Sequence, residues 1–388
     1  MVQVGLEVLM QDASKSFAGQ RLGYVSNQAS TNRNFSHGRI LLQQKYGDRL
    51  TTLFSPQHGF FSEKQDNMIE SAHVVDAVTG LPIYSLYGEH RRPTPMMFAE
   101  LDVLLIDLLD VGTRVYTFLY TMAYCLELAA QLGKKVVVLD RPNPIGGEKI
   151  EGNLLRNNCR SFVGLYPLPM RHGLSFGELA LFINREFAID AELEVVKIQG
   201  WQRAMLSRDT GFPWVCPSPN MPTPETALVY PGQVVWEGTN VSEGRGTTLP
   251  FEFVGAPYWH HSAMLQQLAK TELPGCYLRS IVFEPTSGKW AGQSCTGFQV
   301  HVMNAGIFMP YRTSLALLQA SMLLYPEHFR YKQPPYEYEF ERLPMDLILG
   351  DQQVRCGLEE GRPIMELEED WQEDLDYFAD QREKYLLY

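Results

Sequence analysis

The sequence predicts an α/β protein, with a Rossmann-like parallel sheet in its N-terminal domain and a smaller α+β C-terminal domain. Through the first half, short and almost uninterrupted apolar runs alternate with helical patterns. Such runs are typical of strands buried on both faces of a parallel sheet. The chain has 388 residues, more than one hydrophobic core usually organises, so we expect two domains.

The elements of the first domain follow from these patterns. Strands are predicted at residues 21–27, 50–55, 101–109, 135–140 and 193–198. Helices are predicted at 38–46, 118–132 and 176–187. The second of these helices keeps apolar residues at i, i+3 and i+4, the spacing of one buried helical face. Together they make a βαβ series, which indicates a doubly wound sheet.

A proline-dense stretch, GFPWVCPSPNMPTPETALVYP at residues 211–231, separates the two halves. Proline removes a backbone donor, so we expect neither a regular helix nor a central strand here, but a rigid crossing between domains. The predicted domains are residues 1–226 and 227–388. In the second we expect helices at 263–270 and 313–324, strands at 276–284 and 297–303, and a polar, aromatic tail.

Charge and composition narrow the possible partners. The formal net charge is −12, which argues against nucleic acid or an anionic membrane, because both attract basic surfaces. No apolar stretch approaches the roughly 20 residues of a membrane helix, and the first residues lack the pattern of a signal peptide. The six cysteines are scattered without a C-x-x-C pair, so we expect reduced thiols in a cytoplasmic protein, without a metal site or cofactor.

Polar residues follow the predicted strands at their carboxyl ends, where open α/β sheets bind ligands. Asn27 and Gln28 follow the first strand, Gln57 and His58 the second, and Asn143 the fourth. None of these ends carries G-x-G-x-x-G, so a dinucleotide is disfavoured and a polyhydroxylated ligand is favoured. Each residue alone is explained as well by capping of the next helix. Four polar strand ends together favour a ligand site.

The segment GLSFG, residues 173–177, has the G-x-S-x-G pattern of a serine hydrolase but does not follow a strand. Ser175 with Glu178 fits a capping box instead, which makes an esterase the weakest hypothesis. The preceding Arg171 and His172 are candidate ligand contacts.

A second polar segment, WEGTNVSEGRGTTLPFE at residues 236–252, has too little apolar content for a core strand. It lacks the Gly-Lys-Ser/Thr ending of a phosphate loop. The segment carries Glu237, Asn240, Glu243 and Arg245. We expect it to close over the strand ends, with a solvated turn as the alternative. Tyr116 is one of several aromatics near the expected cleft, and either packs in the core or stacks on a sugar ring.

Eight motifs in order resemble one enzyme family: GLPIYSLYGEHRRPTP, DVGTRVYTFLYTM, LDRPNPIGG, EGNLL, YPLPMRHGLSFGEL, PSPNMPT, YPG and EGTNVSEGRGT. From about Gly5 to Tyr388 the chain resembles the exo-β-N-acetylmuramidases of the NamZ type, glycoside hydrolase family 171. The resemblance implies an active site between a Rossmann-like domain and a smaller one. It also implies release of β-linked N-acetylmuramic acid from the non-reducing end of peptidoglycan fragments, a step of cell-wall recycling.

The implied reaction sets requirements for the site. A protonated carboxylic acid is needed at the leaving oxygen, and a 2-acetamido group on the substrate can act as the second group. The lactyl carboxylate of muramic acid needs a cation, for which Arg114, Arg171 and Arg245 are candidates.

Gln57 stands where members of this family often have glutamate, in Pro-Glu-His-Gly, and an amide cannot donate a catalytic proton. We therefore expect Glu63 or Glu89 to be the acid, with His58 as a polarising or proton-shuttling group. Glu151 and Glu243 are further candidate carboxylates of the site. The alternative is a carbohydrate-binding relative that does not cleave.

The remaining expectations concern substrate contacts and partners. Amides fix hydroxyls or the acetamide, from Asn27, Gln28, Gln57, Asn143 and Asn240. The expected partner is a small amino-sugar or muropeptide substrate, and no sequence signal indicates an oligomeric state.

Overall fold

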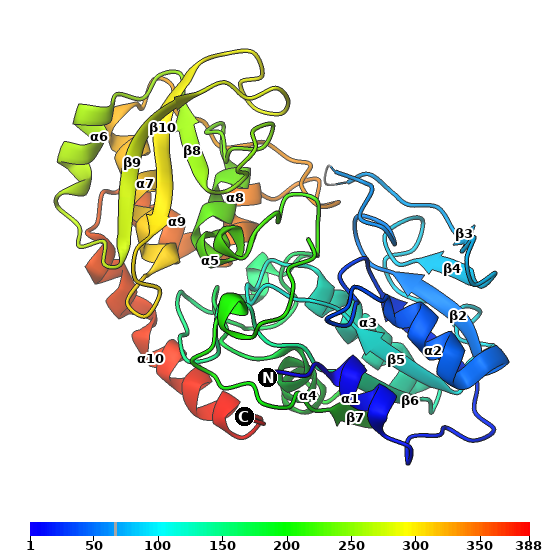
Figure 1. Cartoon of the computed structure of the whole chain (residues 1–388). Coiled ribbons are helices and arrows are strands. Elements are labelled where there is room, and N and C mark those ends of the chain that lie inside the picture. Colours follow the sequence, from blue (N-terminus) through cyan, green and yellow to red (C-terminus); the bar gives the residue numbers. More distant parts are fainter. Residues whose placement is uncertain (66–67) are drawn as a thin grey trace.

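The first domain is built on a seven-stranded sheet with the order β3-β4-β2-β1-β5-β6-β7 (Figure 1). The computed structural model describes residues 1–65 and 68–388. The strands are β1 (Leu22–Ser26), β2 (Leu50–Ser55), β3 (Val74–Val75), β4 (Pro82–Ser85), β5 (Val103–Asp107), β6 (Lys135–Leu139) and β7 (Leu193–Val196). All neighbouring strands pair in parallel except β3 and β4. The predicted α/β fold is confirmed, while the short, half-exposed β3 and β4 were not predicted.

Helices cover both faces of this sheet. They are α1 (Gly5–Gln11), α2 (Gly38–Tyr46), α3 (Phe118–Gln131) and α4 (Phe176–Glu186). Val103 and Leu105 of β5 pack in the core beside α1 and α2, whereas Leu104 and Ile106 face the core that contains α3. This alternation explains the uninterrupted apolar runs, since both faces of each central strand are buried.

The second domain packs helices against a three-stranded antiparallel sheet, β8-β10-β9. Its strands are β8 (Phe253–Ala256), β9 (Cys276–Phe283) and β10 (Cys295–Val302). Its helices are α5 (Pro224–Gln233), α6 (His261–Leu268), α7 (Pro310–Leu324), α8 (Pro344–Leu349), α9 (Gln352–Glu359) and α10 (Ile364–Glu383). Short 3-10 helices are η1 (Gly47–Arg49), η2 (Asn157–Cys159), η3 (Ser207–Asp209) and η4 (Val234–Gly238).

The prediction that residues 211–231 contain no regular helix is wrong at its end, because α5 begins at Pro224. Proline is tolerated in the first helical turn, where its missing N–H has no partner to lose. Thr223 caps the helix by accepting a hydrogen bond from the Thr226 N–H. Residues 211–223 contain no helix or strand, as expected.

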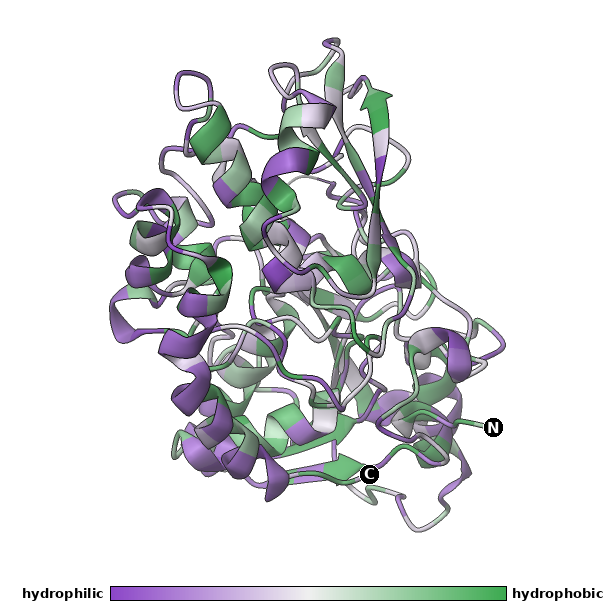
Figure 2. Cartoon of the chain, turned by 90° about the vertical axis from the view of Figure 1, so that its left-hand side faces the viewer, coloured by the Kyte–Doolittle hydropathy of each residue, from purple (hydrophilic) through white to green (hydrophobic). Residues whose placement is uncertain are grey.

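The tail forms a helix that the sequence analysis missed. α10 is 20 residues long and rich in acids, with Ile364, Leu367, Trp371, Leu375 and Phe378 on its buried side. It runs from the second domain down to the first, and its outward side is hydrophilic (Figures 1 and 2).

The residues after α10 dock on the first domain. The Tyr388 hydroxyl donates to Asp140 Oδ2 over 2.7 Å and accepts from the Ile198 N–H at the same distance. The Leu387 N–H donates to Glu178 Oε1, and the Tyr385 hydroxyl donates to Glu186. The C-terminal segment therefore forms part of the surface of the first domain.

Arg114 joins the domains from within. Its guanidinium is fully buried and donates to the carbonyl oxygens of Asn153 and Leu168 in the first domain, at 3.0 and 3.2 Å. It also donates to Ile348 O and Leu349 O at the C-terminus of α8, at 2.9 and 2.7 Å. A helix C-terminus attracts a cation through its unpaired carbonyls.

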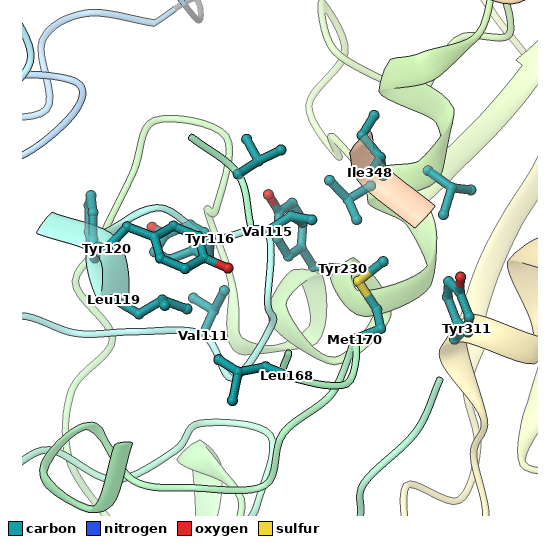
Figure 3. Close-up of a cluster of buried hydrophobic side chains, with 14 of the residues drawn as sticks. Val111, Val115, Tyr116, Leu119, Tyr120, Leu168, Met170, Tyr230, Tyr311 and Ile348 are labelled. Carbon is teal, nitrogen blue, oxygen red and sulfur yellow. The ribbon is translucent and has the colours of Figure 1, made fainter. Parts of the chain in front are cut away.

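A cluster of buried apolar side chains also joins the two domains (Figure 3). Its members include Val111, Val115, Leu168 and Met170 of the first domain and Tyr230, Tyr311 and Ile348 of the second. One continuous core therefore spans both domains.

We expect Arg114→Met to lower the free energy of unfolding by about 3 to 5 kcal/mol, because several buried carbonyls lose their donor. Chemical denaturation followed by circular dichroism would measure the change. Arg185→Met is the matched control: its pair with Asp190 is exposed, so its effect should stay within about 0.5 kcal/mol. A stable Arg114→Met protein that binds substrate weakly would instead favour the ligand role predicted from the sequence.

Candidate functional site

A cleft lies between the strand ends of the first domain and the loops of the second. Both domains contribute polar side chains to its lining. Polar lining from the first domain comes from Gln57, His58, Tyr116, Thr117, Ser218 and Asn220. The second domain adds Tyr230, Glu237, Arg245, Tyr336 and Glu337.

The turn after β2 places Gln57 in the cleft. His58 and Gly59 both have positive φ, 74° and 86°, so the chain reverses immediately after the strand. A left-handed backbone is costly for a residue other than glycine, so His58 is held there by its surroundings. Its Nδ1 lies 2.8 Å from Lys64 O, so Nδ1 donates to that carbonyl, which orients the ring.

Glu337 is the buried carboxyl of the cleft, with 4% of its surface exposed. Its Oε1 accepts from Gln57 Nε2 at 3.0 Å, and its Oε2 accepts from the Tyr87 hydroxyl at 2.6 Å. Burial, together with the charge of Glu237, raises the pKa of Glu337 to about 7, against the hydrogen bonds from Tyr87 and Gln57 and the charge of Arg245. This carboxyl can therefore exchange a proton near neutral pH.

Both polar atoms of the Gln57 side chain form hydrogen bonds within the protein, one of them to Glu337. Besides its bond to Glu337, Nε2 donates to the Tyr87 hydroxyl at 3.2 Å, and Oε1 accepts from Thr117 Oγ1 at 2.5 Å. The amide in place of a carboxylate thus positions an acid that comes from the other domain.

Glu237 lies in a different electrostatic environment. Its Oε1 accepts from Arg245 Nη2 at 2.6 Å, and its Oε2 accepts from the Tyr336 hydroxyl at 2.8 Å. Behind it, Lys289 and Arg245 outweigh the effect of burial and lower the pKa of Glu243. The cleft therefore combines an ion-paired carboxylate with a carboxyl that burial keeps protonated, a division of roles common in acid–base catalysis.

The structure brings four predicted site residues together in the cleft: Gln57, His58, Tyr116 and Arg245. Glu243 lies behind them and pairs with Arg245 and Lys289. Asn27 and Gln28 do not line the cleft; their side-chain amides donate to Pro217 O and Cys216 O. They hold the crossing segment that carries Ser218.

Five other predicted contacts lie outside the cleft. Asn143 donates to Leu174 O, and His172 Nδ1 accepts from the Leu174 N–H. Arg171 donates to Ile145 O, and buried Glu151 accepts from the Arg312 N–H. Asn240 donates to His328 O in the second domain. With Arg114 buried at α8, Arg245 is the arginine of the three candidates that lines the cleft.

The predicted acids Glu63 and Glu89 do not line the cleft either. Glu63 is exposed and accepts from the Phe61 N–H, and the Glu89 side chain is 86% exposed. Since neither carboxyl lines the cleft, neither placement supports the role of general acid there. Ser175 is buried and forms the expected capping box with Glu178, away from the cleft.

The sequence analysis missed Glu337 because it lies about 280 residues after Gln57 in the chain. The signal available was Pro-Pro followed by the alternating Tyr-Glu-Tyr-Glu of residues 336–339. Within residues 1–65 and 68–388, no three His, Cys, Asp or Glu side chains are arranged to hold a metal ion. In the same part of the chain, no helix is both long and apolar enough to span a bilayer.

Comparison with known families agrees with this geometry. Residues 22–225 match the family described as exo-beta-N-acetylmuramidase NamZ, N-terminal, and residues 228–388 match its C-terminal counterpart. The chain belongs to the NamZ family. Gln57 comes from the first matched region of this NamZ-family chain, and Glu337 comes from the second.

Individual relatives extend over the whole chain. The peptidoglycan beta-N-acetylmuramidase NamZ of Bacillus subtilis (strain 168) is 41% identical over 387 residues, covering 100% of this chain and 91% of the relative. Two crystal structures of DUF1343 family proteins from Bacteroides fragilis NCTC 9343 are also similar. One has a TM-score of 0.90 at 32% identity and the other 0.77 at 26%, each covering 100% of this chain and 99% of the other.

Two substitutions should shift the pKa of Glu337 in opposite directions. Tyr87→Phe removes a hydrogen bond that stabilises the carboxylate, so the pKa should rise above about 7. Glu237→Gln removes a neighbouring negative charge, so the pKa should fall. Carbon-13 NMR titration of glutamate-labelled protein would report both, with the resonance assigned from Glu337→Gln. Shifts in the same direction would contradict this electrostatic description.

Proposed function

We propose that this NamZ-family protein is an exo-acting β-N-acetylmuramidase, with Glu337 as its general acid. The observation that carries the proposal is the presence of two different carboxyl groups in one cleft. Burial raises the pKa of Glu337 to about 7, whereas Glu237 forms an ion pair with Arg245. Glycoside hydrolysis uses a protonated carboxyl at the leaving oxygen and negative charge near the anomeric carbon. The family and the B. subtilis relative support N-acetylmuramic acid as the sugar.

In the proposed reaction the Glu337 proton moves to the glycosidic oxygen as the bond from that oxygen to the anomeric carbon breaks. Positive charge develops on the sugar ring, and the ionised Glu237 carboxylate stabilises it. Water then supplies hydroxide to the anomeric carbon and returns a proton to Glu337. The substrate's acetamido oxygen can assist before water attacks.

Substrate contacts follow from what lines the cleft. Arg245 is the proposed partner of the lactyl carboxylate, because it is the cleft arginine and a guanidinium binds carboxylates well. His58 lines the cleft as a further polar side chain and is the proposed contact of a sugar hydroxyl. Tyr116 supplies an aromatic surface, and Ser218 and Asn220 supply hydrogen-bonding groups.

The proposed setting is peptidoglycan recycling in the cytoplasm. Within residues 1–65 and 68–388 the six cysteines are free, as expected in a reducing compartment. Immunoblotting of cytoplasmic and extracytoplasmic cell fractions would test this location, and a protein found outside the cytoplasm would contradict it.

Glu337→Gln should lower kcat on N-acetylmuramyl-N-acetylglucosamine about 100- to 10,000-fold, since the amide cannot donate a proton. The loss should be smaller on 4-nitrophenyl β-N-acetylmuraminide, whose leaving group needs less protonation. In the native enzyme kcat should fall as pH rises through about 7, because the acid ionises. Release of N-acetylmuramic acid, followed by chromatography, would measure each rate.

Glu63→Gln is the matched control and should keep native activity, because Glu63 is exposed and does not line the cleft. Full activity of Glu337→Gln would rule out this acid assignment. Saturable sugar binding without turnover by the native protein would favour the carbohydrate-binding alternative, which the full-length match to a muramidase does not support.

Gln57→Glu should remain active and move the alkaline limb of the kcat profile upward by about one pH unit. The variant places a second carboxyl beside Glu337 and removes the amide that stabilises its ionised form. Gln299→Glu, in the second domain's sheet, is the control and should leave the profile unchanged. A downward shift for Gln57→Glu would contradict the proposed role of the amide.

A further inference from the structure

A second hollow lies beside the cleft and shares Glu337 with it. Its empty volume is about 830 Å³. The first domain supplies Glu89–Arg92, Tyr124, Ser161 and Phe162, and the second supplies Glu337–Glu339. Residues 90–92 (His-Arg-Arg) belong to the motif GLPIYSLYGEHRRPTP, and the proposed reaction gives them no role.

Glu337 and Tyr338 lie between the two hollows. Both have positive φ, 46° and 65°, an arrangement that persists only where the surroundings hold it. Glu337 lines both spaces, whereas Tyr338 lines the second. The proposed acid therefore belongs to a residue that borders both spaces.

Arg91 has no ion pair in this hollow. Its guanidinium carbon lies 3.2 Å from the centre of the Tyr338 ring, and its buried Nε has no hydrogen-bond partner. Among residues 1–65 and 68–388, no carboxylate lies within ion-pair distance of it. In contrast, Arg92 pairs with Glu127, and Glu339 pairs with Arg342. A partly buried, unpaired guanidinium is a strong site for a carboxylate or phosphate.

We propose that the second hollow binds the leaving group of the substrate, and that Arg91 binds a carboxylate or phosphate on it. A general acid protonates the oxygen between the two halves of a glycoside, so it must face both halves. Glu337 faces the cleft that holds the muramic acid and the hollow that contains Arg91. The inference rests on the proposed function. It adds a substrate class, β-N-acetylmuraminides whose leaving group carries a negative charge.

Four substrates test this proposal with the purified full-length chain. Two have neutral leaving groups: 4-nitrophenyl β-N-acetylmuraminide and N-acetylmuramyl-N-acetylglucosamine. One carries a carboxylate on a further muramic acid, and one carries a 6-phosphate on the glucosamine. We expect kcat/KM of the native enzyme to be at least about tenfold higher for a charged substrate than for the neutral disaccharide.

Arg91→Met should lower kcat/KM on the preferred charged substrate about 10- to 100-fold and leave 4-nitrophenyl muraminide within about twofold. Arg91→Lys keeps the positive charge and should lose less kcat/KM on the charged substrate. It tests the proposal even where Arg91→Met does not fold. Arg185→Met, an exposed arginine on α4, is the control and should change neither rate.

The outcomes separate the hypotheses. An equal loss on neutral and charged substrates would overturn the proposal, because Arg91 would then act by positioning Glu337 through Tyr338. Native enzyme that cleaves the chromogenic muraminide but shows no preference for charge would overturn it while leaving the proposed function standing. No cleavage of any substrate would overturn both. Preference for the carboxylate or the phosphate substrate identifies the anion.

Discussion

The buried contact between Arg114 and the end of α8 is the constraint on which the site depends. The cleft takes Gln57 from one domain and Glu337 from the other, so the two domains must keep one fixed relation. Arg114 enforces it by bonding to carbonyl oxygens on both sides. Gly350 follows α8 with φ +73°, and a Cβ there would lie 2.6 Å from the guanidinium. A glycine is thus required where the cation reaches the helix end.

Electrostatics then separates the two acids of the cleft. Glu237 and Glu337 are both almost fully buried, and burial alone would favour the neutral form of each. Arg245 compensates Glu237, whereas Glu337 receives hydrogen bonds only from the neutral Gln57 and Tyr87. The same chemical group therefore has two electrostatic environments within one site, one with a cation beside it and one with neutral donors. Gln57 is neutral, so it adds no negative charge beside Glu337.

The sequence was most informative where hydrophobic periodicity is strong. The central strands and α2, α3 and α4 were predicted closely because both faces of the sheet are buried. Gln57 and His58 were predicted because strand ends meet at one edge of a sheet. Glu337 was not, because its contact with Gln57 depends on how the second domain docks. Arg114 and Glu151 lie outside the cleft, which the sequence did not reveal for the same reason: their side chains bond to segments distant in sequence.

The return of the chain from the second domain to the first has a consequence for biosynthesis. The first domain's buried Asp140 receives one of its hydrogen bonds from Tyr388, after α10, beside those from Ser175 and Gly177. Ribosomes add residues from the N-terminus, and domains usually fold in that order. Here residues 364–388 must leave the exit tunnel before the first domain can bury its last polar groups. A nascent chain without residues 364–388 would hold that domain incomplete, a state in which chaperones find exposed surface.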